Sequence, residues 1–207
     1  MFLKKNFLWL LLFGTMVGLN ETLIGGIHFP FRSVMVSSLT ISLLSFARVK
    51  IPKAGTSAVI TLIAIVFKMN NFGFLACTAH SFLISVFAIL SLGISYEVIG
   101  TLIFRKESSA YLKHLLTCAL SVLTAFTLFG MMNTFVFGSW GTDRLVNFLF
   151  INTPLAALIS GAITVTGLHL SKMLKSLNFK KLNPSVVNSI LGILIIGLWV
   201  LGTWTKL

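Results

Sequence analysis

Long apolar runs recur from one end of this sequence to the other, and short clusters of Lys and Arg separate them. A helix that crosses the hydrocarbon core of a bilayer needs roughly 20 mostly apolar residues. The runs are continuous and rich in Leu, Ile, Val and Phe, without the alternation that membrane barrel strands require. Because backbone groups in lipid must be hydrogen-bonded within their own segment, the runs predict membrane-spanning helices.

The composition predicts one integral-membrane domain over residues 1–207. Of the 207 residues, 57% are hydrophobic and 10% are charged, and the mean hydropathy is +1.00. Soluble domains carry about 25% charged residues, and no polar stretch here is long enough to form one. We therefore predict an all-α fold, a polytopic transmembrane helical bundle in a lipid bilayer, and a bacterial inner membrane fits this composition.

Seven spans account for the apolar runs, and six spans are the alternative. We expect them at about 7–27, 33–47, 54–67, 82–104, 111–135, 148–170 and 186–204. Residues 72–81 predict either an irregular, interfacial or re-entrant piece, or the start of one long, strongly tilted helix. The loop at 138–147, which contains Trp140 and Arg144, connects the fifth span to the sixth.

The first apolar run has two interpretations. Lys4 and Lys5 precede it, as in the charged start of a secretory signal peptide. No small-x-small cleavage site follows, however, and apolar character resumes after Glu21, so we favour retention as a first spanning helix. Cleavage would instead leave Glu21 near a new amino terminus.

The net charge of +12 follows the positive-inside pattern. With the amino terminus in the cytoplasm, twelve basic residues fall on the inner side and four on the outer side. The inner set is Lys4, Lys5, Arg48, Lys50, Lys53, Arg105, Lys106, Lys113, Lys172, Lys175, Lys180 and Lys181; the outer set is Arg32, Lys68, Arg144 and Lys206. These clusters lie between apolar runs and form no single basic face, so the charge predicts a cytoplasmic amino terminus and no nucleic-acid partner.

Glu21 marks the candidate site, because an acid inside a membrane span needs a partner or a function. Polar residues expected near the outer face predict a pocket that binds a small polar solute through charge-assisted hydrogen bonds. The substrate-binding candidates are Asn20, Glu21, His28, Arg32, Asn71 and His80, with Lys68, Asn70 and Asn133 as neighbours. The alternative is that Glu21 pairs with Arg32 or with a helix end and only fixes packing.

A second polar group is expected near the inner face, formed by Glu97, His114 and His169. Glu97 there either has a function or neutralises Arg105, Lys113 or His114. Two of the four histidines, His28 and His80, are expected toward one side, and His114 and His169 toward the other. Each pair could supply the two imidazole ligands of a b-type haem, so haem binding is an alternative to a chain without a cofactor. No metal-binding spacing, nucleophile motif or phosphate loop occurs, so we predict no catalytic residue and favour a non-enzyme.

Small residues recur one helical turn apart in two spans. Gly14 and Gly18 form one such pair and Ala157 and Gly161 another, and both pairs predict close helix packing within the bundle. In size and hydropathy the whole chain resembles the substrate-binding S components of energy-coupling factor transporters, and Gly14 and Gly18 are similar to the small-residue pattern of their docking helix. The resemblance implies capture of a vitamin or metal ion from outside, with a membrane coupling subunit and ATPases as partners. It implies no particular binding residue.

The sequence thus predicts a membrane transporter, or a substrate-binding transporter subunit, for a small polar or ionic solute. Its pocket is expected around Glu21 near the outer face. The alternatives are a non-transport membrane protein, either a haem-containing redox carrier or a membrane-embedded enzyme, and a membrane assembly or scaffold protein.

Overall fold

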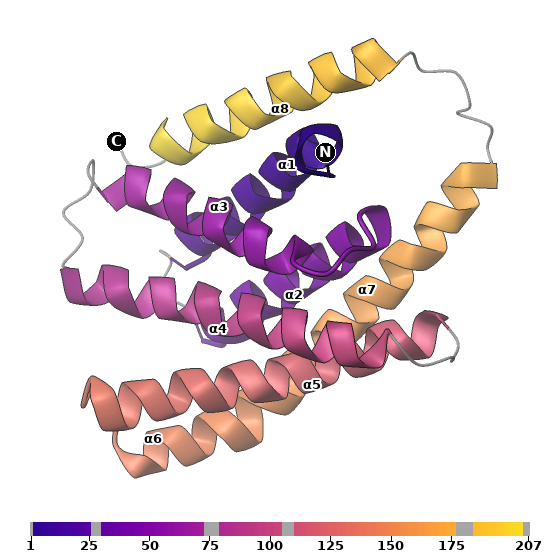
Figure 1. The fold of residues 1–207 in the computed structure, drawn as a ribbon. Helices are drawn as coiled ribbons and strands as arrows, with labels where there is room; N and C mark the ends of the chain where they lie inside the picture. Colours follow the sequence, from indigo (N-terminus) through magenta and orange to yellow (C-terminus); the bar gives the residue numbers. More distant parts are fainter. Residues whose placement is uncertain (1, 26–29, 73–78, 105–109, 177–183, 205–207) are drawn as a thin grey trace.

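The computed structural model describes residues 2–25, 30–72, 79–104, 110–176 and 184–204, and their regular structure is entirely helical. The elements are α1 (Phe2–Leu23), α2 (Arg32–Lys50), α3 (Thr56–Phe72), α4 (Ala79–Ile103), α5 (Ala110–Met131), η1 (Met132–Val136), α6 (Thr142–Asn147), η2 (Phe148–Asn152), α7 (Thr153–Ser176) and α8 (Pro184–Trp204). Here η denotes a π-helical segment. Because η1 continues α5 and η2 joins α6 to α7, these elements form seven helical rods in the described part of the chain (Figure 1).

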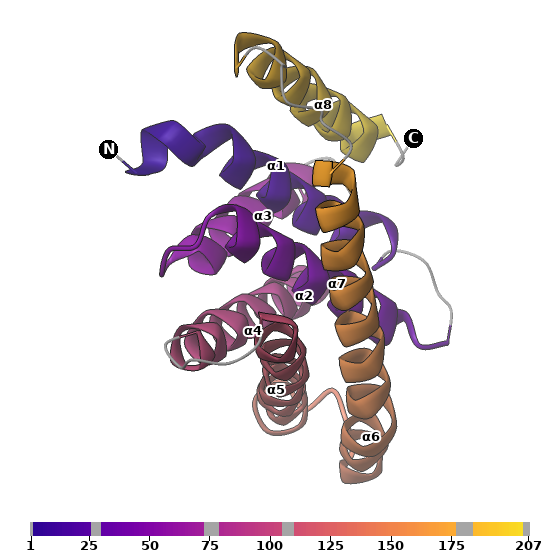
Figure 2. The same cartoon turned by 90° about the vertical axis from the view of Figure 1, so that its right-hand side faces the viewer.

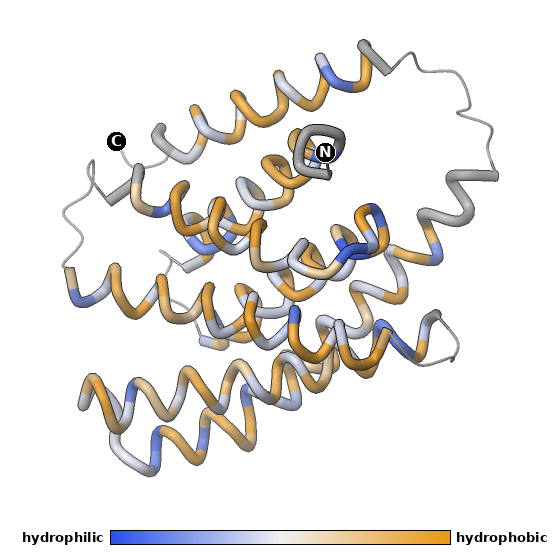
Figure 3. Tube along the Cα trace, viewed as in Figure 1, coloured by the Kyte–Doolittle hydropathy of each residue, from blue (hydrophilic) through white to orange (hydrophobic). Residues whose placement is uncertain are grey.

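Four segments of the described chain are long and apolar enough to cross a membrane: Arg32–Lys50, Ala79–Ile103, Tyr111–Val136 and Thr142–Leu170. Thr56–Met69 and Val186–Gly202 are shorter apolar helices. Apolar residues cover most of the length of the helices, and hydrophilic residues gather near their ends (Figure 3). The all-α class is thus confirmed, together with helices suited to a membrane, whereas the number of spans and the cytoplasmic amino terminus stay predictions.

Helix α2 lies at the centre of the bundle and packs against α1, α3, α4, α5 and α7 (Figure 2). Helix α8 lies at the edge and packs mainly on α1. Successive rods run in opposite directions, so the helix termini gather at two ends of the bundle (Figure 1). We call the end where α1 finishes and α4 begins the Glu21 end, and the end where α2 finishes and α3 begins the Glu97 end.

The described cations divide between these ends as the sequence predicted. Arg48, Lys50, Lys53 and Lys113 lie toward the Glu97 end, and Arg32, Lys68 and Arg144 lie toward the Glu21 end. The predicted inner and outer sides are therefore opposite ends of the bundle.

The central position of α2 depends on its small polar side chains. Ser38 and Ser42 are buried, and each hydroxyl lies 3.2 Å from a carbonyl oxygen of α7, that of Ala156 or Ser160. Small side chains let helix backbones approach closely, and hydroxyls can bond across the resulting interface. A helix that is covered by protein over most of its surface thus needs no uniformly apolar surface.

The predicted small-residue pair of the first helix packs inside the bundle. A Cβ atom added to Gly18 would lie 2.8 Å from the Phe67 ring, and one added to Gly14 would meet the Ile63 side chain. Both contacts are with α3, so the interpretation as internal packing is confirmed. The two glycines that carry the resemblance to S components are covered by their own chain.

One predicted boundary is wrong and another is extended. The third apolar helix begins at Thr56, close to the expected start, and continues to Phe72, a few residues beyond the expected end. The expected loop at 138–147 is largely helical, because Thr142–Asn147 forms α6 and leads without a break into η2. Of residues 72–81, Phe72 ends α3 and 79–81 begin α4, whereas 73–78 lie outside the described residues.

Candidate functional site

A cavity of about 960 Å³ opens at the Glu21 end of the bundle. Its walls come from the end of α1, the first turns of α2, the first half of α4, the end of α5 with η1, and the α6–η2 segment. Ligand pockets are commonly 300–1,000 Å³, so this cavity has room for a small molecule together with water. Five parts of the chain that are distant in sequence therefore contribute to one concave surface.

Glu21 lies in the last turn of α1 and lines this cavity. Its residue surface is 9% exposed, and its carboxylate hydrogen-bonds the side chain of Ser85 on α4. Lys68 and Arg32 act on the carboxylate electrostatically, but no cation among the described residues lies within the 4.0 Å of an ion pair with it. The acid is thus desolvated and incompletely partnered, next to open space.

Polar groups of both charges share the cavity wall with Glu21. Arg32 and Arg144 line it, so the charged side chains of the lining sum to +1. Asn133 is 1% exposed, and its Nδ2 donates to the Phe129 carbonyl oxygen at 2.9 Å. Its Oδ1 has no hydrogen-bond partner in the described part of the protein. Buried acceptors are normally satisfied, so this oxygen has unfilled hydrogen-bonding capacity in a residue of the cavity wall.

Four aromatic rings form the apolar part of the wall. Phe126 and Phe148 stack at 4.6 Å between centroids, and Trp140 meets Phe148 edge-on at 4.9 Å. Phe129 contacts both Trp140 and Phe148, and all four rings line the cavity. The Arg144 guanidinium lies 4.9 Å from the centre of the Trp140 ring, which fixes this cation at the wall.

Both π-helical segments of the described chain contribute to the cavity. Asn133 belongs to η1, and Phe148, Ile151 and Asn152 belong to η2. Widened turns of this type occur often at functional sites, because they redirect side chains at one face of a helix. Pro154 provides the cause in η2, since proline has no N–H for the carbonyl four residues earlier and crowds it sterically.

The remaining predicted outer residues divide into three cases. Asn20 is buried and does not line the cavity; its Nδ2 lies 2.8 Å from the Val36 carbonyl oxygen and 3.0 Å from Thr40 Oγ1, both on α2, and its Oδ1 has no partner in the described chain. His80 lies outside the cavity lining, exposed, with its Nε2 3.2 Å from Ser139 Oγ. Asn71 holds a helical position in α3, and its side chain, like all of His28, lies outside the described residues.

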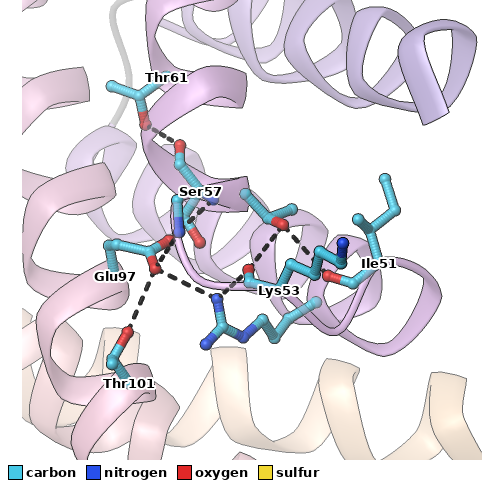
Figure 4. Close-up of polar contacts among 9 residues, drawn as sticks. Ile51, Lys53, Ser57, Thr61, Glu97 and Thr101 are labelled. Carbon is cyan, nitrogen blue, oxygen red and sulfur yellow. Dashed lines mark hydrogen bonds and ion pairs between the residues drawn. The ribbon is translucent and has the colours of Figure 1, made fainter. Parts of the chain in front are cut away.

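Glu97 has a different environment at the opposite end (Figure 4). Its Oε1 accepts from Gly55 N at 2.7 Å and its Oε2 from Ser57 N at 2.9 Å, at the start of α3. Arg48 Nη1 lies 3.2 Å from Oε1, and Thr101 donates to the same oxygen at 3.2 Å. Glu97 thus caps α3 from another helix and pairs with Arg48.

The predicted inner group does not form one cluster in the described chain. The expectation that Glu97 neutralises Lys113 or His114 is wrong, because its cationic partner is Arg48; Arg105 lies outside the described residues. His114 is buried with its Nδ1 3.2 Å from Ser45 Oγ, and His169 is an exposed residue of α7. No group of three His, Cys, Asp or Glu residues in the described chain is arranged to hold a metal ion.

The sequence indicated no site role for Ser85, Trp140 or Arg144, which the fold brings to the same cavity as Glu21. For η2, the position of Pro154 inside a helical segment could have predicted the irregular turn. Trp140 and Arg144 lie in a segment whose polarity is that of an ordinary loop, so the sequence carried no signal for them. Comparison with known proteins adds no assignment, since no family model, curated protein or solved structure matches this chain.

Proposed function

We propose that this chain is a membrane transporter, or the substrate-binding subunit of one, and that it takes a small polar or ionic solute in the cavity around Glu21. The observation that carries the proposal is a desolvated carboxylate with no ion-pair partner within 4.0 Å in the described chain, placed at a cavity. Acids inside membrane helices are costly, and they commonly mark solute or ion pathways.

The chemistry of the lining supports recognition of a solute that carries both signs of charge. Glu21 and the free Oδ1 of Asn133 accept hydrogen bonds, which suits an ammonium or N–H group. Arg32 and Arg144 suit a carboxylate or another anionic group, since guanidinium binds such groups with paired hydrogen bonds. The aromatic rings suit an apolar or planar portion between the charged groups.

The finer topology belongs to the same proposal. With seven spans, a cytoplasmic amino terminus and a bacterial inner membrane, the Glu21 end and its cavity face outward. The sequence carries no phosphate-binding loop, so active uptake would take its energy from a membrane coupling subunit and ATPase partners. Since α3 covers Gly14 and Gly18, such a coupling subunit would dock on another surface.

The test is solute binding by purified protein with Glu21→Gln, in lipid nanodiscs. A panel of zwitterionic, anionic and cationic solutes is screened by the shift in Tm of the wild-type protein, and hits are titrated by calorimetry. We expect Glu21→Gln to weaken binding of the hits at least about tenfold, while the protein remains monodisperse and helical.

Asp143→Asn is the matched control, because Asp143 is exposed at the same end and does not line the cavity. It removes the same charge and should leave binding unchanged. Full binding by Glu21→Gln, or equal loss of binding in the Asp143→Asn control, would contradict the proposal.

A further inference from the structure

Polar side chains continue from the cavity toward the Glu97 end, between α4 and α5. A Cβ atom added to Gly100 would lie 3.6 Å from Thr117 Cγ2, which sets the register of these two antiparallel helices. The same register places Leu92 beside Ala125, and both of them line the cavity. One turn deeper, it places Ser95 and Tyr96 of α4 beside Ser121 of α5.

Three buried hydroxyls along this interface are unpaired. The exposed fractions of Ser95, Thr117 and Ser121 are 3%, 0% and 0%. None of their hydroxyls has a hydrogen-bond partner among the described residues. By contrast, Thr124 and Thr127 of α5 donate to the carbonyl oxygen one turn earlier, at 2.9 and 2.8 Å. Buried hydroxyls without partners carry a desolvation cost, and internal water is the usual partner of such groups.

A connected polar cluster adjoins these hydroxyls and extends farther from the cavity. Ser45 Oγ on α2 lies 2.9 Å from Tyr96 Oη and 3.2 Å from His114 Nδ1. It also lies 3.8 Å from Cys118 Sγ, which contacts Thr164 Oγ1 at 3.5 Å. All five residues are buried. The polar interface therefore reaches from the floor of the cavity to His114, near the first turns of α5.

We propose that the cavity continues inward as a water-filled path between α2, α4 and α5, lined by Ser95, Ser121 and Thr117 and ending at His114. Water molecules there satisfy the three unpaired hydroxyls and link them to the Ser45 cluster. The path goes beyond solute binding at the cavity, because it extends polar, hydrated surface from the cavity floor deep into the bundle. Such hydration distinguishes a bundle with a polar interior from one whose cavity has a dry floor.

Radiolytic hydroxyl-radical labelling tests this path in the wild-type protein in nanodiscs. Radicals form from internal water where it lies, so side chains beside such water are labelled even when they are buried. Tyr96 and Phe67 are each 1% exposed, and Phe67 packs among α1, α3 and α8, away from the path. We expect Tyr96 to be labelled several-fold faster than Phe67 in the wild-type protein. In the Tyr96→Phe variant both probes are phenylalanine, so intrinsic reactivity is equal, and we expect residue 96 still to be labelled faster than Phe67. Equal rates in that variant would overturn the proposal.

Ser121→Ala provides an independent measurement. If the interface is dry, removal of an unpaired hydroxyl raises Tm; if water bonds to it, the substitution removes hydrogen bonds and lowers Tm. We expect a lower Tm, and an unchanged or higher Tm would overturn the path. Neither experiment needs a solute. A negative result in either one therefore contradicts the water-filled path without bearing on solute binding, which the Glu21→Gln variant tests.

Discussion

Glu21 and Glu97 are both glutamates in apolar helices, yet their surroundings are opposite. Glu97 accepts from two backbone N–H groups and from Thr101, and it pairs with Arg48. Glu21 hydrogen-bonds Ser85 and has Lys68 and Arg32 as more distant cations, beside a cavity. One carboxylate is saturated by the fold, and the other retains capacity for a further donor.

The difference shows how two acids in similar sequence contexts acquire different roles. Glu97 satisfies N–H groups at the start of α3, where a helix has no intrahelical acceptors, and the helix dipole favours its negative charge. Removing the Glu97 carboxylate leaves these N–H groups and Arg48 without their acceptor, so it lowers the stability of the folded state itself. Removing Glu21 deprives an incoming solute of a partner, so its main effect should appear in binding.

The largest effect is expected from Glu97→Gln. The substitution leaves Arg48 without its counter-ion and turns an amide NH₂ toward donors at the start of α3. Breaking a fully buried ion pair costs about 3–5 kcal/mol. The Arg48–Glu97 pair is only partly buried, so we expect the free energy of unfolding to fall by about 2 kcal/mol. Denaturant titration in detergent micelles, followed by circular dichroism, measures it.

A double variant isolates the ion pair from the helix cap. Arg48→Met with Glu97→Gln should be less destabilised than the sum of the two single variants, because no charge is left unpaired. If Glu97→Gln is as stable as wild type, Glu97 does not stabilise the fold, and the contrast drawn between the two glutamates is wrong.

Glu21→Gln should show the reverse pattern. Loss of the carboxylate should weaken solute binding at least about tenfold, or about 1.4 kcal/mol. The free energy of unfolding should change by less than about 1 kcal/mol, because the acid has no close ion pair to lose. Calorimetric titration and the same denaturant assay give the two values. Destabilisation equal to that of Glu97→Gln would assign Glu21 a structural role.

Asn133→Leu separates binding from stability within the cavity. The change keeps the number of side-chain heavy atoms, removes the buried Oδ1 that has no partner in the described chain, and also removes the Nδ2 hydrogen bond to the Phe129 carbonyl oxygen. The relieved desolvation cost and the lost hydrogen bond are each about 1 kcal/mol, so we expect the free energy of unfolding to change by less than about 1 kcal/mol, while solute affinity falls. A variant destabilised by more than this would mean that Asn133 belongs with the saturated groups, as Glu97 does.

Arg144→Ala should have the smallest effect on stability. It removes an exposed cation that lies over the Trp140 ring at the rim of the cavity, and such contacts contribute about 0.5–1 kcal/mol. The loss should be absent in a Trp140→Leu background, which a double-mutant cycle on the free energy of unfolding reveals. An equal loss in both backgrounds would exclude the cation–π contact as its cause.

Part of the cavity lining was predictable. Apolar runs predicted the helices, and the cost of charge in lipid singled out Glu21, which the fold places at the cavity with Arg32 and Asn133. His80 was wrongly assigned to the site. Its distance from the end of its helix predicts its depth in the membrane, but not the direction in which its side chain points. Trp140 and Arg144 were assigned no role because the polarity of residues 138–147 predicted a loop. In the structure Thr142–Asn147 forms α6, and both residues line the cavity.

The sequence by itself determined the all-α class, the division of cations between two ends and the presence of an unusual acid at one of them. These properties follow from local hydropathy and charge, which each segment carries independently of its neighbours. Only the tertiary structure decided that Arg48 is the partner of Glu97 and that Ser85 is the partner of Glu21. Such pairings depend on how each helix is rotated and shifted against the next, and close packing of the whole bundle sets that rotation.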